Sequence, residues 1–397
     1  MIKIKYIKKF KNQTALLENF SYITLLQIFI IISPLITYPY LIRVVGKELY
    51  GWVVTAQVLV SYATIIINFG TNSVCAKHVS ISRDNKDKLS EILSSVFWGR
   101  LGLAIISFLI YLAIVLLIPS YRDHLLLFLL SYGLTFDALL FPQYFFQGIE
   151  KMKISSLINI GIKLFFILLI FTIVKDPEDY LLIPSFYSIG YIVAGIVSLT
   201  MISRKFGIRL SKPSWDSVKL YLKESSPLFA TDIVCTIKDK LNYFLLGAIN
   251  MGEVVVYDLG VKLTAMLAKP GTIISTVLFP RFAKNRSVDL FKRVLLIELI
   301  VVALCVILVN IFMPFIVEFL IGQKIDILPL RVFSLAPIFL TVSSHISQNC
   351  YVAFGHNKYT FYSILVTTSG YLFFLVYLYI SHNLNTIFSF VILSVIL

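Results

Sequence analysis

The chain has 397 residues, of which 58% are hydrophobic and 14% are charged, against roughly 25% charged residues in soluble domains. Its mean hydropathy is +0.88. The 35 lysines and arginines outnumber the 21 acidic residues, but they form short clusters between apolar runs, which excludes a nucleic-acid-binding module. This composition predicts an integral membrane protein.

Apolar runs of the length needed to cross a bilayer, about 20 residues in a helix, recur along the whole chain. They predict an all-α polytopic protein with about 12 membrane-spanning helices. The final run, residues 384–397, has only 14 residues and is interpreted as the start of a truncated twelfth span. The other predicted spans are residues 16–41, 49–73, 92–118, 124–147, 154–174, 180–202, 226–249, 255–280, 290–316, 327–354 and 359–381.

Basic residues are distributed unequally between the loops on the two sides of the membrane. If the N-terminus is cytoplasmic, the loops on that side hold 23 lysines and arginines, and the opposite loops hold five. Basic residues concentrate in cytoplasmic loops, so this bias predicts a cytoplasmic N-terminus. One missed helix would invert every later loop and remove the bias.

The longest basic connector, residues 204–223, has six predicted spans before it and six after it. This arrangement predicts two six-helix bundles, residues 1–203 and 224–397, around a central cavity. Such halves often rock against each other in alternating-access transporters. A single bundle with one long loop is the alternative that the sequence leaves open.

The loops are too short to hold a soluble catalytic domain. The chain also has no nucleotide-binding, zinc-protease or serine-hydrolase motif. We therefore predict a protein that is not an enzyme, with no catalytic residue, no metal site and no cofactor; coupling to H⁺ or Na⁺ stays open.

Charged residues near the centres of the seventh and eighth spans carry the functional signal. Each charge at a helix centre costs about 2.5–3.5 kcal/mol on insertion scales, so these side chains cannot face lipid. They must form pairs or line a hydrated cavity. The residues concerned are Lys238, Asp239, Lys240, Lys262 and Lys269.

Helical spacing places polar residues on one face of several spans. The stripes are Asp232, Thr236, Asp239 and Tyr243 in the seventh span, Asp258, Lys262, Ala265 and Lys269 in the eighth, and Gln57, Ser61, Thr64 and Asn68 in the second. Stripes on several helices predict a water-filled cavity, with closed structural pairs as the alternative. The predicted substrate-binding residues are Lys262, Lys269, Asp239, Asp232, Asp258, Gln57 and Asn68.

Three longer stretches carry a family resemblance. They are LLQIFIIISPLITYPYLIRVVGKELYGWV at residues 25–53, PQYFFQGIEKMK at residues 142–153 and KDKLNYFLLGAINMGEVVVYDLGVKL at residues 238–263. They resemble polysaccharide flippases, the Wzx-type O-antigen transporters of the multidrug/oligosaccharidyl-lipid/polysaccharide exporter superfamily. The segment VVVYDLG departs from the family pattern, which makes Asp258 a candidate for a role particular to this chain.

The resemblance implies that the chain moves an undecaprenyl-diphosphate-linked oligosaccharide from the cytoplasmic to the periplasmic leaflet of a bacterial inner membrane. Its partners would be this substrate and membrane lipids; whether other glycan-assembly proteins bind it stays open. Lys262 and Lys269 would bind the diphosphate, since lysine contacts phosphate as a point charge.

Asp239 is expected to pair with Lys269 when the cavity is empty, because matching the midpoints of two antiparallel spans puts them at similar depth. Substrate phosphate would then compete for Lys269 and leave Asp239 to take up a proton. A fixed structural ion pair is the alternative.

Two other classes of membrane protein remain as alternatives. A cation-coupled drug exporter of the same superfamily would share the twelve-span plan, but its cavity would be acidic or aromatic rather than rich in lysine. An integral-membrane glycan polymerase would carry a large outer loop with catalytic residues, and the predicted outer loops are short.

Overall fold

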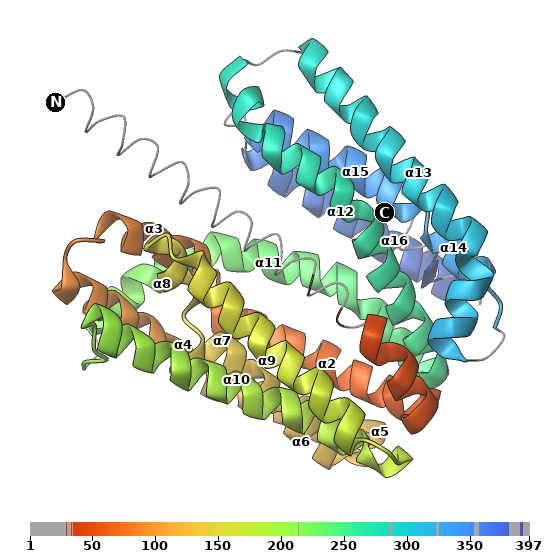
Figure 1. The fold of residues 1–397 in the computed structure, drawn as a ribbon, viewed down its shortest axis with the longest axis horizontal. Helices are drawn as coiled ribbons and strands as arrows, with labels where there is room; N and C mark the ends of the chain where they lie inside the picture. The colour runs from red at the N-terminus through yellow and green to blue at the C-terminus, as the bar shows by residue number, and fades with distance from the viewer. Residues whose placement is uncertain are drawn as a thin grey trace. The chain divides into compact units, whose positions relative to one another are not determined.

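The computed structural model describes residues 35–212, 214–285, 288–322, 325–352 and 357–380, and the single positions 29, 33, 390 and 391. These residues form helices joined by short connections, with no strand in the described ranges (Figure 1). The fold is thus the all-α polytopic membrane fold that the sequence predicts. Most of the first predicted span and of the run 384–397 lies outside the described residues.

Eight helices of the described ranges are long and apolar enough to cross a membrane. They coincide with the second to sixth and the ninth to eleventh predicted spans. They are Lys47–Ile81, Lys86–Leu117, Leu125–Gly148, Met152–Ile173, Pro177–Phe206, Val288–Ile321, Leu328–Tyr351 and Phe361–Leu378.

The seventh and eighth predicted spans form helices that are less apolar than these eight. They are α11 (Trp215–Ile249) and α12 (Met251–Asn285), each 35 residues long. Neither is among the helices with an apolar stretch of spanning length, because charged residues interrupt both of them.

The chain divides into two compact units. The first unit comprises residues 1–40 and 56–233, and the second comprises residues 41–55 and 234–397. Helices α2 (Lys47–Asn68) and α11 therefore contribute their two ends to different units. The predicted division at residues 204–223 stays a prediction.

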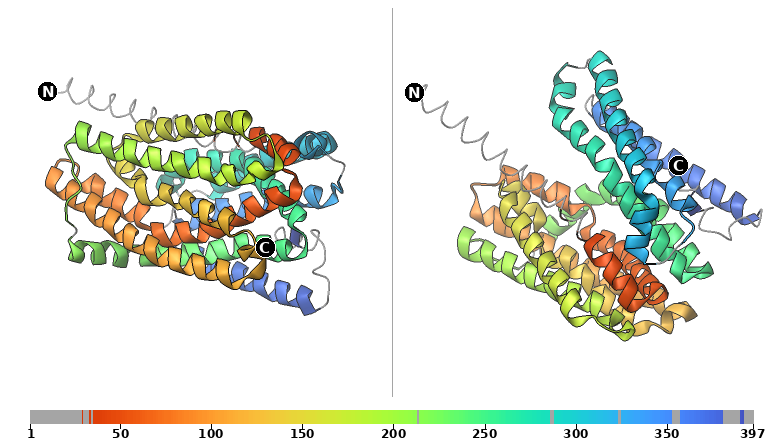
Figure 2. Two further views of the ribbon diagram at one scale, coloured as in Figure 1. Left: turned by 90° about the horizontal axis from the view of Figure 1, so that it is seen from below. Right: turned by 45° about the vertical axis from the view of Figure 1, so that its right-hand side comes forward.

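The long helices of the first unit run alongside one another (Figure 2). Helix α10 (Leu182–Met201) packs against both α7 (Phe136–Leu140) and α9 (Met152–Ile173). Helix α4 (Lys86–Leu117) begins where the Asn85 side chain accepts a hydrogen bond from the Lys88 backbone N–H at 3.0 Å, a typical N-cap. It ends just before Pro119, which disfavours a helical conformation for the preceding residue.

Helix α8 (Gln143–Gly148) supplies the aromatic core of the first unit, where it packs against α3 (Thr71–Ile81). Tyr144, Phe145 and Phe146 are all buried. At Gly148, a β-carbon would lie 2.8 Å from the carbonyl oxygen of Ala76, so glycine is needed for the close approach of α8 to α3. Much of the family-like stretch PQYFFQGIEKMK thus builds a packing interface.

Arg100, on α4, is 2% exposed and holds three helices of the first unit together. Its guanidinium donates to Thr71 Oγ1 at 2.8 and 3.1 Å, to Asn72 Oδ1 at 2.8 Å and to the Ala138 carbonyl at 2.7 Å. It also lies 5.3 Å from the centroid of the Tyr144 ring. Its hydrogen-bond partners are neutral, so Arg100 acts as a structural cation inside the bundle.

In the second unit, α12 packs against α13 (Val288–Ile321) and α15 (Ala336–Ile346) around Leu267, Val302 and Val306. The short α14 (Leu328–Phe333) precedes α15. A π-helix, η4 (Ser347–Val352), continues α15 and contacts α16 (Asn357–Ile380).

The first turns of α2 join the second unit through a close contact with the start of α12. A β-carbon on Gly51 would lie only 2.2 Å from the carbonyl oxygen of Met251. The Thr55 hydroxyl also lies 3.3 Å from the sulfur of Met251. Gly51 therefore sets the distance between these two helices.

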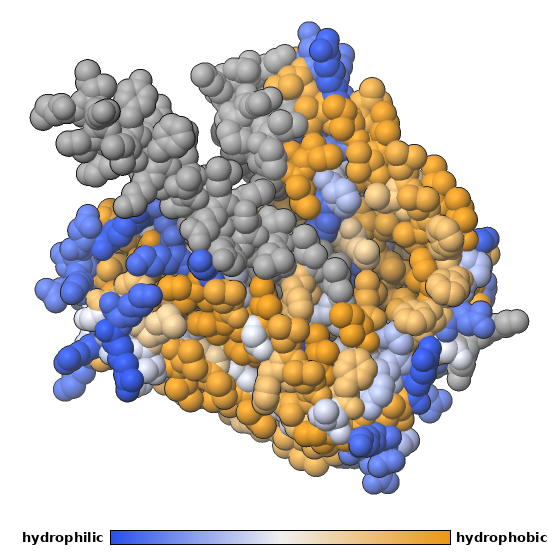
Figure 3. Space-filling view, in the orientation of Figure 1, coloured by the Kyte–Doolittle hydropathy of each residue, from blue (hydrophilic) through white to orange (hydrophobic). Residues whose placement is uncertain are grey.

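The surface of each unit has the polarity of a membrane protein. In the face shown in Figure 3, hydrophilic residues gather at the helix ends and apolar residues cover the helix sides. Helix α13 exposes Leu304, Ile307, Ile311 and Phe315 at helical spacing. Such a stripe is typical of a helix face in contact with lipid.

The predicted topology can be tested by thiol labelling. Single cysteines replacing the exposed residues Lys86 and Lys212, in a cysteine-free variant, should resist a membrane-impermeant thiol reagent in intact cells. A cysteine replacing the exposed Glu178 should react, because the charge bias places it outside. Labelling at Lys212 from outside the cell would contradict the two-bundle topology.

Candidate functional site

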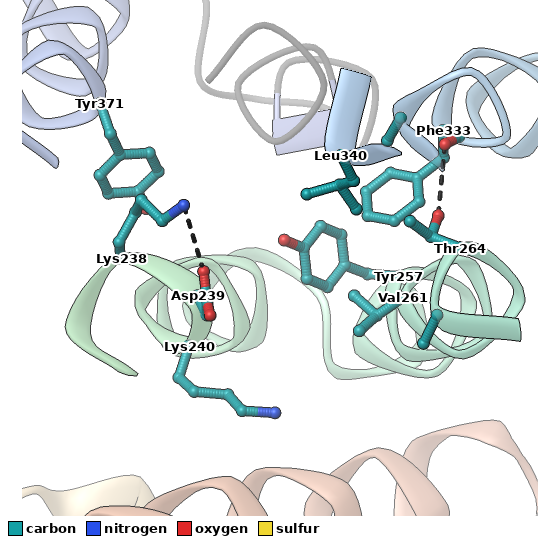
Figure 4. Close-up of a pocket in the computed structure, with 11 residues that line it drawn as sticks. Lys238, Asp239, Lys240, Tyr257, Val261, Thr264, Phe333, Leu340 and Tyr371 are labelled. Atoms are coloured by element: carbon teal, nitrogen blue, oxygen red, sulfur yellow. Dashed lines mark hydrogen bonds and ion pairs between the residues drawn. The ribbon is translucent and has the colours of Figure 1, made fainter. Parts of the chain in front are cut away.

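A cavity of about 300 Å³ lies inside the second unit, at the side of α11 and α12 where α14, α15 and α16 approach them (Figure 4). Its lining combines charged, aromatic and aliphatic side chains, which suits a ligand that is partly polar and partly apolar. The lining residues are Lys238, Asp239, Lys240, Tyr257, Val261, Thr264, Ala265, Phe333, Ala336, Leu340 and Tyr371.

The three charged residues of the lining are consecutive on α11. The ammonium of Lys238 lies 3.5 Å from a carboxylate oxygen of Asp239, whose side chain is 59% exposed. Lys240 leaves the helix in another direction (Figure 4), and its ammonium lies 5.2 Å from the ring centroid of Tyr243. Two lysines with one carboxylate give this described lining an excess positive charge.

Asn242 fixes the tyrosines of the cavity wall. Its amide N–H donates to the Tyr257 hydroxyl at 2.9 Å, and its carbonyl oxygen accepts from the Tyr371 hydroxyl at 2.5 Å. All three side chains are buried. These bonds connect α11, α12 and α16, so the aromatic wall is held in place from three helices.

Lys262 and Asp258, both predicted substrate ligands, form an ion pair one helical turn apart on α12. The second carboxylate oxygen of Asp258 accepts a hydrogen bond from the buried Tyr243 hydroxyl at 3.0 Å. The pair lies next in sequence to two lining residues, Tyr257 and Val261, but it is not part of the lining.

The expected pair of Asp239 with Lys269 is not what the structure shows, because Asp239 pairs with Lys238 instead. The hydrogen bonds from α11 residues 242 and 243 to α12 residues 257 and 258 set the register of the two helices. This register brings Asp239 level with α12 residues 260–262, about eight residues from Lys269. At 1.5 Å per residue the two differ in depth by roughly 12 Å.

The other predicted site residues belong to the first unit. Asp232 is exposed on the first-unit part of α11, and Gln57 and Asn68 are half-buried on α2. The Asn68 side chain accepts a hydrogen bond from Asn72 at 3.4 Å. Of the seven residues predicted from helical stripes, the structure therefore places Asp239 in the cavity lining, and the roles of all seven stay predictions.

Sequence reasoning also missed part of the lining. Lys238 and Lys240 are charges that cannot face lipid, but they do not belong to the polar stripe of the seventh predicted span, which passes through Asp239. Tyr371 and Phe333 sit in apolar runs and carry no signal of their own.

Comparisons with known proteins agree with this picture. The family profile "Polysaccharide biosynthesis protein" matches residues 16–286. A protein of Escherichia coli (strain K12) named "Putative O-antigen transporter" is 26% identical over 289 residues, which cover 72% of this chain and 69% of that protein. A protein of Shigella dysenteriae with the same name is 23% identical over 332 residues, 82% of this chain and 83% of its own length.

No solved structure gives a significant match to the chain. The family profile covers well over half of the 397 residues and includes both α11 and α12. The chain therefore belongs to the polysaccharide biosynthesis protein family.

Proposed function

We propose that this chain is a flippase for a lipid-linked oligosaccharide, an O-antigen repeat unit carried on undecaprenyl diphosphate. It moves this substrate from the cytoplasmic to the periplasmic leaflet of a bacterial inner membrane. The observation that carries the proposal is the similarity, over 72% and 82% of the chain, to two proteins named for O-antigen transport. The eight apolar helices support a role inside the membrane.

The cavity of the second unit supports a substrate with a negatively charged and a sugar-like part. A diphosphate needs cationic partners, and Lys238 and Lys240, two lining residues on α11, supply point charges on different sides of this helix. Tyr257 and Tyr371 line the cavity and offer ring faces to sugars. A volume of about 300 Å³ is at the lower end of small-molecule sites, so the cavity takes the diphosphate and adjoining sugar.

Transport by alternating access follows from this proposal, because a polar headgroup cannot cross the hydrocarbon layer while it is exposed to lipid. The lipid tail stays in the bilayer while the headgroup passes through the protein. No covalent bond of the substrate has to change, so the proposed activity is transport and not an enzymatic reaction.

Deletion of the gene tests this function directly. Cells without the protein should accumulate undecaprenyl-linked oligosaccharide in the cytoplasmic leaflet and lose surface glycan. A drug exporter would instead change drug sensitivity with normal surface glycan. A glycan polymerase would leave single repeat units in the periplasmic leaflet, so the leaflet in which the intermediate accumulates separates the three functions.

The lysines of the cavity provide a sharper prediction. Replacing both Lys238 and Lys240 by alanine should lower surface glycan at least tenfold, because loss of 1.4 kcal/mol in substrate binding already corresponds to a factor of ten. Surface glycan is measured in complemented deletion cells, with protein in the membrane measured in parallel. Arginine at both positions should retain more export than alanine, since the charge is kept.

Lys219→Ala is the matched control, because Lys219 is exposed on the same helix outside the cavity. It should export normally. Normal export by the double alanine variant would show that the cavity lysines do not bind substrate. Loss of export in Lys262→Ala or Lys269→Ala alone would move the phosphate site to the predicted residues on α12.

A further inference from the structure

A second polar cluster lies buried in the second unit, apart from the lining residues of the cavity. It consists of Ser275 on α12, Glu298 on α13, His345 on α15 and Asn349 on η4. Each of the four is at most 1% exposed. Four separate helical elements thus contribute one polar side chain each to a single point in an apolar bundle.

The cluster is centred on a contact between an acid and a base. Nδ1 of His345 lies 2.9 Å from Oε2 of Glu298. The Asn349 amide nitrogen lies 3.1 Å from the same Nδ1 and 2.5 Å from the Ser275 hydroxyl. The ring of Phe291 covers the imidazole, with ring centroids 4.5 Å apart.

Two oxygens of the cluster are buried without a hydrogen-bond partner in the structure, Oε1 of Glu298 and Oδ1 of Asn349. A buried acceptor left without a donor typically costs about 1–3 kcal/mol, and more when it is charged. A fully ionised Glu298 beside a neutral imidazole would therefore be an expensive arrangement at this point.

One proton removes the uncompensated charge. A hydrogen between Nδ1 and Oε2 belongs either to the imidazole, which gives an ion pair, or to the carboxyl group, which gives two neutral partners. Both states have no net charge, whereas loss of the proton leaves one negative charge and a second proton leaves one positive charge. Burial favours the state without net charge.

Other ionisable side chains occur on the elements packed around the pair. In the described part of the chain they include Lys269 on α12, Lys292 and Arg293 on α13, and Cys350 and Tyr351 on η4. Within the described part of the chain, the carboxylate of Glu298 pairs with His345.

We propose that Glu298 and His345 form a binding site for one proton inside the second unit. Release of this proton would leave a net buried charge, so it requires a conformation in which water reaches the pair. Resting on the flippase function proposed above, this links proton release and uptake to the conformational cycle of transport.

Proton binding can be tested without substrate. Infrared difference spectra of the purified protein in lipid bilayers, recorded between neutral and alkaline pH, should show loss of a proton from a buried carboxyl or imidazole group. This signal should disappear in Glu298→Gln, which preserves most of the side-chain volume and leaves a neutral imidazole. In His345→Gln the carboxyl group of Glu298 holds the proton alone, so a carboxyl signal should remain but at a changed frequency. Glu318→Gln, an exposed position on the same helix, should keep the wild-type signal.

An unchanged difference spectrum in a folded Glu298→Gln variant would overturn the proposal. Thermal unfolding of each variant shows whether it is folded. If Glu298→Gln does not fold, His345→Gln still decides, because a carboxyl signal unchanged by loss of the imidazole would equally overturn the shared site.

A transport measurement separates this inference from the flippase function. The protein is placed in liposomes with a pH-sensitive dye, and lipid-linked oligosaccharide extracted from deletion cells is added to them. Wild type and Glu318→Gln should move both oligosaccharide and protons, whereas Glu298→Gln should lose proton movement. The inference is overturned if oligosaccharide is transferred without proton movement that depends on Glu298. It is also overturned if transfer requires Na⁺ and this requirement depends on Glu298. Either result leaves the flippase function intact. Absence of transfer in wild type refutes the flippase function, and the infrared measurement then still tests the proton site.

Discussion

Replacing Arg100 by methionine is expected to lower the free energy of unfolding by about 3 kcal/mol. Methionine keeps much of the aliphatic volume but leaves Asn72 Oδ1 and the Ala138 carbonyl without the donors they have now. Replacing one partner in a buried polar network is costly, because the remaining acceptors stay in the apolar interior. Thermal or denaturant unfolding of the purified protein in detergent measures the loss.

Arg122→Met is the matched control for this change, because Arg122 is exposed. It should unfold as the wild type does. Arg100→Lys should also be destabilised, since an ammonium cannot reproduce the forked contacts to Thr71, Asn72 and Ala138. Wild-type stability of Arg100→Met combined with lost export would instead assign Arg100 to substrate binding.

Gly51→Ala should destabilise the protein by about 2–3 kcal/mol, although alanine is the better helix former. Alanine in place of glycine gains at most about 1 kcal/mol within a helix. At Gly51 the new methyl group would meet the Met251 carbonyl oxygen at 2.2 Å, so α2 or the start of α12 must shift. The clash involves backbone, which a rotamer change cannot relieve.

Gly102→Ala tests the same substitution where there is space, since no atom outside its own helix lies within 4 Å of the new β-carbon. This variant should be as stable as the wild type or slightly more stable. Equal unfolding temperatures for Gly51→Ala and Gly102→Ala would show that the α2 contact with α12 contributes little.

The predicted spans agree well with the described helices, because bilayer thickness imposes a length that composition reveals. Helix α13 matches the predicted span 290–316 within a few residues at each end. The depth of individual residues could not be predicted as well. The expected pair of Asp239 with Lys269 was based on matching the midpoints of the two spans. The register is instead fixed by Asn250, the single residue that joins α11 to α12.

Two of the family-like motifs contribute to helix packing in the structure. Gly51 and Gly148 lie in two of the motifs, and each permits a close contact between helices. Sequence alone does not separate a motif that binds substrate from one that packs, because both require particular residues. The aromatic cavity wall was equally hidden, since Tyr371 looks like any other tyrosine in an apolar span until Asn242 is seen to hold it.

The proton-site residues illustrate the same limit. In the sequence, Glu298 and His345 are isolated ionisable residues in two predicted spans. Their separation of 47 positions hides a contact of 2.9 Å. Only the packing of α13 against α15 brings the acid and the base together.

The polarity of α11 and α12 has a consequence for biosynthesis. Neither helix is among those with an apolar stretch of spanning length, and one residue joins them. They are therefore expected to leave the translocation channel together, as a hairpin in which Asn242 meets Tyr257 and Tyr243 meets Asp258. A ribosome stalled before α12 emerges should hold α11 beside the channel, whereas the strongly apolar α13 needs no partner to enter the bilayer.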